Sequence, residues 1–306
     1  MIKKRGLLIN VSSMMYCIAS IMILWSAFGT VCKGEGPPLE AVYPPPESAD
    51  DIRDLDAVKL LRTALEKTEP SDGAFAMYPS KSGVMSTARY QKEVQDGVRL
   101  NVIWAAVTEE LEQDALPVRI PIRKGILGYR IFLIRKQDRE KFAKITTLDE
   151  LKQLTVGQGH GWKDVEVFKA NGFPVITGDS YEGLFKMLVN GRFDYFSRGI
   201  NEAPEEYAAR KDDLPDLWVE EHLLLYYPWP KYFFVSKNAP LLADRLERGL
   251  NMMIEDGSFD EIFREYHGAS IQAANLKNRR LFTISNPLLP ATAPLGRKQL
   301  WYTPIK

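Results

Sequence analysis

Two features of this sequence have the chemistry to hold a small charged solute. A glycine-rich turn at residues 157–161 (GQGHG) precedes a helix expected over about 162–170, and backbone N–H groups at the start of a helix bind anions. Glycines spaced in this way also form tight turns that need a positive φ, so both interpretations stay open. Arg198 offers a planar guanidinium that suits an anionic group, and its alternative is a surface ion pair with Glu202.

Three aromatic side chains are candidates to stack on such a solute. Tyr43 precedes three prolines and either stacks on a ligand or covers those prolines. Trp104 lies within the apolar run 98–107, so it belongs to a core unless the strand ends there and opens it to a cleft. Trp162 stands at the start of the predicted helix, where it either lines a cleft or packs beside the turn.

Residue types used in catalysis are present without the spacing that catalysis needs. The sequence has no nucleophile-elbow, Ser-x-x-Lys, zinc-protease or phosphate-loop motif. Its three histidines, His160, His222 and His267, are far apart and lack metal-ligand spacing. Glu109, Glu110 and Glu202 have the chemistry of general acids or bases, but acidic residues at corners of a chain are usually just solvated. We therefore expect no catalytic residue, no metal and no cofactor.

Composition places the chain among ordinary globular proteins. Hydrophobic residues make up 45% and charged residues 26% of its 306 positions, enough for one large domain or two small lobes. Equal numbers of basic and acidic residues give a formal net charge of +0, so nothing indicates nucleic acid as a partner. The two cysteines, Cys17 and Cys32, lie in or beside the N-terminal segment, so no internal disulfide is expected.

The N-terminus has the pattern of a targeting segment. Basic residues 3–5 precede an apolar stretch over 7–31, and the small residues Ala27 and Gly29 lie two apart, as signal peptidase prefers. The alternative is an uncleaved anchor, because the whole stretch approaches the roughly 20 residues that span a bilayer. Cleavage is favoured because the densest apolar part is short. We predict a signal peptide over residues 1–32 and an exported protein.

Alternating strand and helix patterns over the remaining chain predict an α/β protein. The run 98–107 is rich in β-branched residues and predicts a strand. The segment 54–68 has apolar residues on one face and predicts a helix that Pro70 ends. Two prolines within the extended run 114–122 exclude it from the centre of a sheet. A pair of amphipathic helices is expected over about 239–268.

The order of these segments resembles the type II periplasmic binding proteins, in particular family 3 of the extracellular solute-binding proteins. The loop 43–45 (YPP) and the corner 191–194 (GRFD) resemble motifs of that family, and so does the glycine-rich turn. The most specific match is the run 232–268, with a return strand, a long helix, an Asp-Gly-Ser turn and a terminal Tyr-x-Gly. The resemblance covers about residues 38–268.

This resemblance implies a two-lobed α/β fold with a ligand cleft between the lobes, closed by a hinge. Lobe one would comprise residues 33–134 and 232–306, and lobe two residues 135–231. The Pro-rich part beyond about 283 would wrap the surface. The Thr-rich corner of the family corresponds to the segment ending at Thr108. The predicted ligand-binding residues are Tyr43, Trp104, Thr108, Gly159, Trp162 and Arg198.

Two departures from the family's pattern bear on the solute. Amino-acid binders of the family place an arginine after the Thr-rich corner to clamp an α-carboxylate, where this chain has Leu111. They place an aspartate after a strand of the second lobe to hold the α-amino group, near the position of Arg198 here. The lost clamp and the change from an acidic to a basic side chain argue against an ordinary α-amino acid and favour an anionic group.

We therefore expect a periplasmic solute-binding protein that traps a small polar solute, with an anionic group as one interpretation, for an ABC-type transporter or a receptor. A membrane permease or receptor is the expected partner, nucleic acid is not, and we expect a monomer. Two other classes stay open. One is an enzyme on the same fold, such as a dehydratase-like lyase, and the other is a free-standing sensor or accessory protein.

Overall fold

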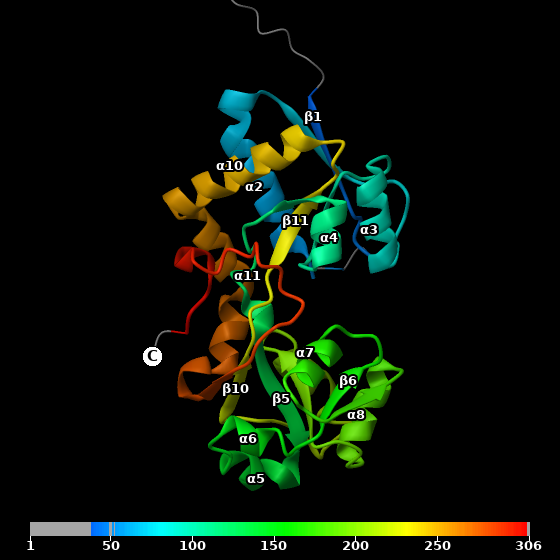
Figure 1. Ribbon diagram of the computed structural model, residues 1–306, viewed down its shortest axis with the longest axis vertical. Coiled ribbons are helices and arrows are strands. Elements are labelled where there is room, and N and C mark those ends of the chain that lie inside the picture. The colour runs from blue at the N-terminus through cyan, green and yellow to red at the C-terminus, as the bar shows by residue number, and fades with distance from the viewer. Residues whose placement is uncertain (1–37, 49–50, 52, 305–306) are drawn as a thin grey trace, which may run out of the picture. The chain divides into compact units, whose positions relative to one another are not determined.

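Figure 1 shows the computed structural model of the chain, which describes residues 38–48, 51 and 53–304. The predicted signal peptide, residues 1–32, lies outside the described residues, so its cleavage stays a prediction. Residues 39–306 form one unit of the chain. None of the helices in the described ranges combines the length and the apolar character that a membrane span requires.

One group of elements surrounds a three-stranded sheet. Its members are β1 (Leu39–Tyr43), α2 (Leu55–Asp72), β2 (Phe75–Pro79), α3 (Thr87–Asp96), β3 (Val102–Ala106), α4 (Glu109–Asp114), β4 (Leu116–Val118), β11 (Lys231–Val235), α10 (Pro240–Asp256) and α11 (Ser258–Ala274). The sheet has the order β3-β11-β4 and is antiparallel, while β1 and β2 form a separate parallel pair. β11 is central, and its side chains alternate between two cores: Phe233 and Val235 enter one, Tyr232 and Phe234 the other. β4 lies at the sheet edge, where its proline is tolerated.

The second group surrounds a seven-stranded mixed sheet. Its members are β5 (Tyr129–Arg135), α5 (Arg139–Ala143), α6 (Leu148–Leu151), β6 (Val156–Gly159), α7 (Asp164–Ala170), β7 (Val175–Gly178), α8 (Tyr181–Val189), β8 (Tyr195–Gly199), α9 (Ala203–Arg210), β9 (Leu217–Val219), β10 (Leu223–Tyr226) and β12 (Arg280–Thr283). The order is β12-β10-β5-β8-β6-β7, and β9 pairs with β5. β6, β7 and β8 are parallel to one another, and β5 is antiparallel to β8. Phe168 of α7 and Phe185 of α8 belong to different cores, so these helices cover opposite faces of the sheet.

Helices α2 and α10 pack closely because α10 has a glycine where they meet. A Cβ added to Gly249 would lie 2.1 Å from the backbone oxygen of Ala64. Arg245, one turn earlier on α10, is 1% exposed and donates hydrogen bonds to the Thr68 hydroxyl (2.8 Å) and the Gly73 carbonyl (2.8 Å). These contacts hold α10 against α2 where the two helices cross (Figure 1).

One local prediction from the sequence was wrong. Helix α2 does not end before Pro70 but runs to Asp72, with Gly73 in the left-handed region (φ 81°) at its C-terminus. Pro70 lies in the last turn, where only one N–H is lost from the helix. The segment after Thr108 forms the short helix α4, in which the Thr108 hydroxyl accepts the Leu111 N–H at 3.2 Å.

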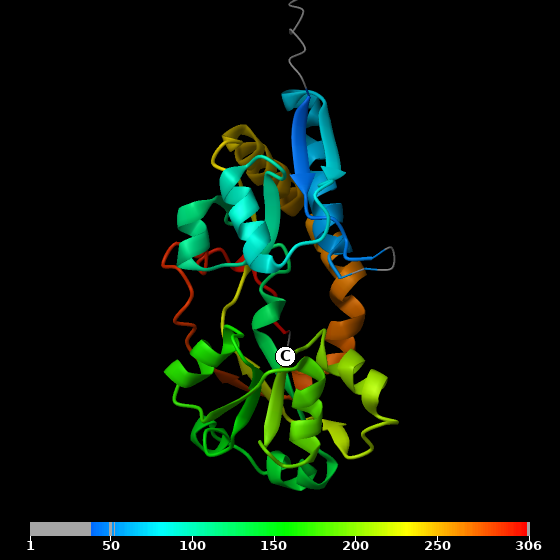
Figure 2. The same cartoon turned by 90° about the vertical axis from the view of Figure 1, so that its right-hand side faces the viewer.

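The segment 232–306, expected to complete the first lobe, contributes to both sheets. Its strand β12 pairs in parallel with β10 of the seven-stranded sheet. Residues 284–302, which we call the C-terminal strap, then run back to the elements around the three-stranded sheet (Figure 2). Near its start, Asn286 donates to the Pro228 carbonyl at 3.0 Å, and farther along Thr292 donates to Glu112 of α4 at 2.6 Å. The strap is more than a surface wrap, because Leu300 is 1% exposed.

Candidate functional site

Arg198 lies on β8 in a buried ion pair. Its side chain is 9% exposed, and its Nε and Nη2 donate to the two Glu206 oxygens at 2.8 and 2.6 Å. Burial alone would lower the pKa of Arg198, but the hydrogen bond to Glu206 and the charges of Glu202 and Glu206 raise it above its usual value. The guanidinium therefore has its carboxylate partners inside the chain, and an anionic solute would have to displace them.

Glu202 follows the end of β8 and keeps one oxygen free of hydrogen bonds from the described residues. Its Oε2 accepts the Gly199 N–H at 2.8 Å and lies 3.3 Å from Arg198 Nη2 and 3.7 Å from Arg130 Nη1. Its side chain is 34% exposed. Burial would raise the pKa of Glu202, but the charges of Arg198 and Arg130 and the Gly199 N–H lower it below the usual 4.5. Glu202 is thus an ionised carboxylate with an accessible oxygen.

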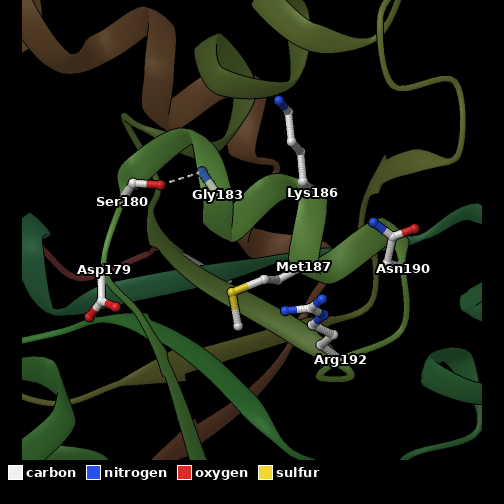
Figure 3. A pocket seen from close by; sticks show the side chains of 7 residues that line it. All are labelled: Asp179, Ser180, Gly183, Lys186, Met187, Asn190 and Arg192. Carbon is white, nitrogen blue, oxygen red and sulfur yellow. Dashed lines mark hydrogen bonds between the residues drawn. The ribbon is translucent and has the colours of Figure 1, made fainter.

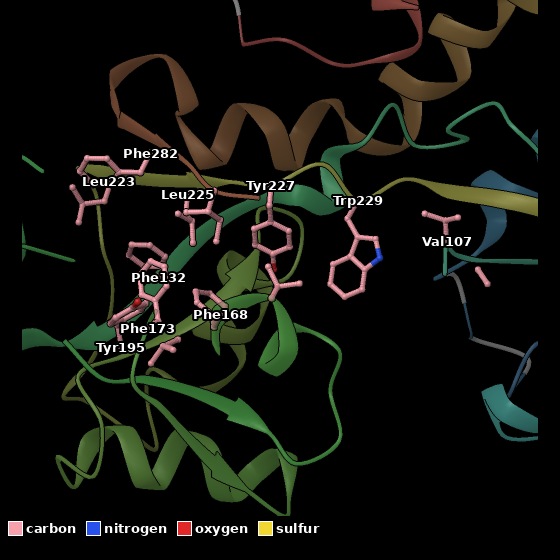
Figure 4. Close-up of a cluster of buried hydrophobic side chains, with 14 of the residues drawn as sticks. Val107, Phe132, Phe168, Phe173, Tyr195, Leu223, Leu225, Tyr227, Trp229 and Phe282 are labelled. Carbon is pink, nitrogen blue, oxygen red and sulfur yellow. The ribbon is translucent and has the colours of Figure 1, made fainter. Parts of the chain in front are cut away.

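Arg130, on the neighbouring strand β5, is held by two groups on the other face of the sheet. Its Nε donates to the Tyr227 hydroxyl at 2.8 Å, and its Nη2 pairs with Asp164 of α7. The Tyr227 hydroxyl in turn donates to Asp164 at 2.5 Å. The ring of Trp229 lies 5.9 Å from the Arg130 guanidinium, and Figure 4 shows Tyr227 and Trp229 following each other along one segment. Arg130 is therefore fixed in place before any solute binds.

The glycine-rich turn positions Trp162. A Cβ added to Gly159 would lie 2.3 Å from the indole ring of Trp162, so only glycine lets the ring settle over the end of β6. Gly161 has φ +77°, which satisfies the tight-turn interpretation at that position. The His160 N–H donates to the Gly178 carbonyl at 2.9 Å. The Trp162 ring stacks near Phe196 at 6.1 Å and lies 4.9 Å from the Arg198 guanidinium.

These residues gather where ligands usually bind in open α/β sheets. β6 ends at Gly159 and the parallel neighbour β8 ends at Gly199. Trp162 and Glu202 follow these two ends. Ligands in such sheets lie beyond the carboxyl ends of the strands. Three of the predicted residues, Gly159, Trp162 and Arg198, thus belong to one group. Glu202, considered from the sequence as an ion-pair partner or a general acid or base, supplies the accessible charge.

A second set of charged side chains lies beside the three-stranded sheet, which we call the first charged cluster (Asp54, Asp56, Arg123, Lys231 and His267). Arg123 Nε and Nη2 donate to the two oxygens of Asp56 at 2.6 and 2.7 Å, and Nη2 also reaches Asp54 at 2.8 Å. Lys231 Nζ donates to Asp54 at 2.9 Å. His267 Nε2 lies 2.9 Å from Asp56 Oδ2.

Asp54 and Lys231 each affect the pKa of the other. Burial would raise the pKa of Asp54, but the charges of Lys231 and Arg123 and the indole of Trp104 lower it. Burial and the Arg123 charge lower the pKa of Lys231, and Asp54 opposes this. The Asp54 side chain is 41% exposed and that of Lys231 is 14% exposed. Both groups therefore combine strong desolvation with residual access to solvent.

Tyr43 and Trp104 come together beside this cluster. Their ring centroids lie 6.0 Å apart, and Trp104 also meets the Phe233 ring edge-on at 6.4 Å. Tyr43 is buried, which favours its packing role, whereas Trp104 is only partly buried. Trp104 thus packs on the core with part of its ring accessible, and the two interpretations of this residue coexist.

Thr108 serves as the N-cap of α4, and nothing in its contacts assigns it a second role. Leu111, at the position where the resembling family has an arginine clamp, is 3% exposed and belongs to the hydrophobic core. The leucine at this position packs in the core, so recognition of an acidic group would have to come from other residues.

A pocket of about 340 Å³ is found at a different place, along α8. Figure 3 shows its lining residues, Asp179, Ser180, Gly183, Lys186, Met187, Asn190 and Arg192. It contains none of the six predicted residues. Its Ser180 hydroxyl already accepts the Gly183 N–H at 3.1 Å. Neither Glu202 nor Trp162 lines this pocket. We therefore place the candidate site at the strand ends.

We call Arg130, Asp164, Arg198, Glu202 and Glu206 the second charged cluster. The arginines and lysine of the two clusters contribute four positive charges (Arg123, Lys231, Arg130, Arg198) and the acids five negative charges (Asp54, Asp56, Asp164, Glu202, Glu206). His267, which faces Asp56 at 2.9 Å, adds a further positive charge when it is protonated. Arg123 is also among the charges that lower the pKa of Glu202, so the clusters influence each other. Such a site suits a solute with a cationic group.

Most of the charged residues in these clusters were not predicted as site residues. The predicted set of site residues contains none of Arg123, Arg130, Asp54, Asp164, Glu206 and Lys231. Each of these residues lies at the border of an apolar segment. Charged residues occur at such borders on any protein surface, so this position alone does not indicate a binding site.

No protein-family model matches the chain, and no curated protein matches it. Solved structures do resemble it. A candidate binding component of an ABC transporter from Wolinella succinogenes, in complex with lysine, has a TM-score of 0.52 at 14% identity, covering 74% of this chain and 94% of that one. The protein YckB from Bacillus subtilis has a TM-score of 0.51 at 18% identity, covering 81% and 96%. An ancestral arginine-binding protein bound to glutamine has a TM-score of 0.50 at 19% identity, covering 76% and 99%.

Within this chain the segments 119–128 and 227–230 connect the two sheets, and the chain passes again into β12 and back along the C-terminal strap. The expected fold is confirmed: the chain has the mixed α/β, two-lobed fold of the type II periplasmic binding proteins.

Proposed function

We propose that this chain binds a small polar solute through a cationic group of that solute, held by the Glu202 carboxylate and the Trp162 ring. It would act in the periplasm as a monomer, and it would deliver the solute to a membrane permease or a receptor. The lobe boundaries predicted from the sequence are part of this proposal. Lobe one comprises residues 33–134 and 232–306, and lobe two residues 135–231. Strand β12 of lobe one pairs within the seven-stranded sheet.

Glu202 carries the proposal. Its Oε2 is occupied by the Gly199 N–H and by two guanidinium groups, which keep the carboxylate ionised. Its Oε1 has no hydrogen bond in the described part of the chain, and a third of the side chain is accessible. A carboxylate held ionised by structural cations, with one oxygen free, is prepared to accept an ammonium or guanidinium N–H.

The aromatic ring of Trp162 supports the same ligand chemistry. A cation gains energy over an indole face within about 6 Å, more than over other rings. Trp162 is partly accessible and stands beside Arg198, whose charge is compensated by Glu206. Arg198 is therefore not proposed as an anion clamp.

The bound molecules of the structural neighbours point in the same direction. The Wolinella succinogenes protein holds lysine and the ancestral arginine-binding protein holds glutamine. Both solutes carry an ammonium group. At the identities given above these proteins support the fold of this chain, and their ligands indicate which compounds to test first.

A solute screen on the purified chain tests the proposal. Lysine, arginine, cadaverine and glutamine would be compared with glutamate, succinate and glucose by thermal shift and then by calorimetry. A solute at 100 times its dissociation constant adds about 2.7 kcal/mol of stability, which for a protein of this size corresponds to roughly 5 °C or more. Glu202→Gln should abolish the shift with the cationic solutes, and Glu205→Gln, an exposed neighbour on α9, should leave it unchanged.

The outcomes separate the remaining classes. Binding of succinate or glutamate with no response to amines would refute the role of Glu202. Recovery of a bound solute in altered chemical form after incubation would indicate an enzyme on this fold instead of a binding protein.

A further inference from the structure

Helix α11 is a single element whose two ends are buried in the cores beside two different sheets. In its first turns Phe259 and Ile262 pack in the core beside the three-stranded sheet. At its other end Ala274, followed by Leu276, packs in the core beside the seven-stranded sheet. The 17 residues of α11 form about 25 Å of continuous helix. Because a helix bends sharply only where its backbone hydrogen bonds are interrupted, α11 links the positions of the two sheets.

Polar contacts hold α11 to the elements around both sheets. His267 Nε2, on the buried side of the helix, lies 2.9 Å from the Asp56 carboxylate of α2. Just beyond the helix, Arg279 donates to the Ala274 carbonyl at 2.7 Å and to the Glu220 carbonyl at 2.6 Å. The Arg279 side chain is 4% exposed. A tilt of α11 relative to either sheet would therefore break contacts that are shielded from water.

The C-terminal strap makes a second link of the same kind. Near its start the Asn171 side chain, at the end of α7, donates to the Ser285 carbonyl at 2.8 Å and accepts the Ser285 N–H at 3.2 Å. Near its other end Leu300 is buried in the core beside the three-stranded sheet. There Arg297 also donates to the Asn251 side chain of α10 at 2.9 Å. Each end of the strap is thus held by elements of a different sheet.

The two links flank the segments 119–128 and 227–230, which connect the sheets. In Figure 1 and in Figure 2, α11 (orange) lies on one side of these segments and the first part of the strap (red) on the other. A rotation that moves the sheets together along one link would lengthen the path along the other. We call α11 and the C-terminal strap together the brace.

We propose that the brace holds the two sheets in a nearly fixed relative position, so that this chain takes up its solute without the hinge closure that the family resemblance implies. The inference concerns a motion of the chain and does not depend on which solute binds. A site that already has its binding geometry spares the solute the free energy of closing the protein.

Distances between two spin labels test the proposal. Cysteines would replace Glu110 of α4 and Lys169 of α7, which are both exposed, in the full chain with Cys17 and Cys32 changed to serine. Double electron–electron resonance would measure the distribution of the distance between the labels, without solute and with saturating lysine. We expect one narrow distribution, whose mean shifts by less than about 2 Å when lysine is added, as in pre-organised proteins.

Two changes would interrupt the brace at exposed positions. Ala269→Pro breaks α11 between its two buried ends, because proline lacks the N–H and clashes with the preceding turn. A specific protease site inserted after the exposed Leu295 lets the strap be cut once the protein has folded. Each change would be measured alone and with the other, so the cut strap still tests the brace if Ala269→Pro does not fold. We expect a broader distribution and a shift with lysine that exceeds about 2 Å.

Glu247→Pro is the matched control. It breaks α10, a helix of the same length as α11 whose buried residues all lie beside the three-stranded sheet. It should lower the melting temperature, as Ala269→Pro does, and leave the distance distribution unchanged. Circular dichroism would establish that each variant is folded.

Two results would overturn the inference. A shift of more than about 2 Å in the uncut parent chain, or two separate distances in its solute-free distribution, would show that the sheets move despite the brace. An unchanged distribution after both interruptions would show that α11 and the strap restrain nothing. Failure of lysine and the other amines to bind the parent chain would instead refute the proposed function, and the solute-free distributions would still decide the role of the brace.

Discussion

Replacing Arg198 by methionine separates a structural cation from a ligand clamp. The guanidinium donates to both oxygens of Glu206, and both side chains are less than a tenth exposed. Removing one partner of such a pair leaves a buried charge and costs about 3–5 kcal/mol. Tyr181 keeps its hydrogen bond to Glu206 at 2.7 Å, which places the loss toward the lower end. At about 2–4 °C per kcal/mol, the melting temperature should fall by roughly 10 °C.

The assay is urea and thermal unfolding of the single variants Arg198→Met and Glu206→Leu and of the double variant. Because an apolar pair of similar volume can replace a buried ion pair, the double variant should regain most of the lost stability. Arg210→Met is the matched control, since its partner Glu182 is 64% exposed and such a pair contributes about 1 kcal/mol or less. A small stability loss in Arg198→Met, accompanied by complete loss of solute binding, would refute the structural role.

Three further predictions follow from named contacts. Gly249→Ala should destabilise the protein by about 1–3 kcal/mol because its Cβ would strike the α2 backbone, whereas Gly268→Ala, with nothing within 4 Å, should be neutral or slightly stabilising; chemical denaturation of the pair measures the difference. The affinity for lysine should stay constant from pH 7 to 5 and fall only below 4.5, since the pKa of Glu202 is lowered and its carboxylate ionised above that value; a loss between pH 7 and 5 would contradict this. Trp301→Ala should cost about 2 kcal/mol in thermal unfolding, because the Trp301 ring fills the space over Gly125 and is partly buried; an unchanged melting temperature would mean that the C-terminal strap contributes no stability.

The elements that the sequence predicted best are those with local signals. The amphipathic repeat of α10 and α11 and the glycine between them, Gly257 with φ 84°, specify two helices and their junction without reference to the rest of the chain. Pro70 shows the limit of such rules, since a proline in a last turn removes one hydrogen bond and packing of α2 against α10 maintains the helix.

The site was predicted in part, for a physical reason. Gly159 and Trp162 are three residues apart, so their contact follows from the local turn. The partner of Arg198 could not be chosen from spacing. Glu202 precedes helix α9 and Glu206 lies on it, and only the packing of α9 decides between them. Lys231 and Asp54 are 177 positions apart in the sequence, and no pattern within one segment connects them.

The interleaving of the two sheets has a consequence for how the chain folds. β11, the central strand of the three-stranded sheet, arrives only at residues 231–235, and β12, which completes the seven-stranded sheet, only at 280–283. During synthesis neither sheet is complete until most of the chain has been made. Closing strand pairs across such long separations is slow. The nascent chain should thus remain without a finished core for most of its translation, a state that suits passage through a membrane before folding.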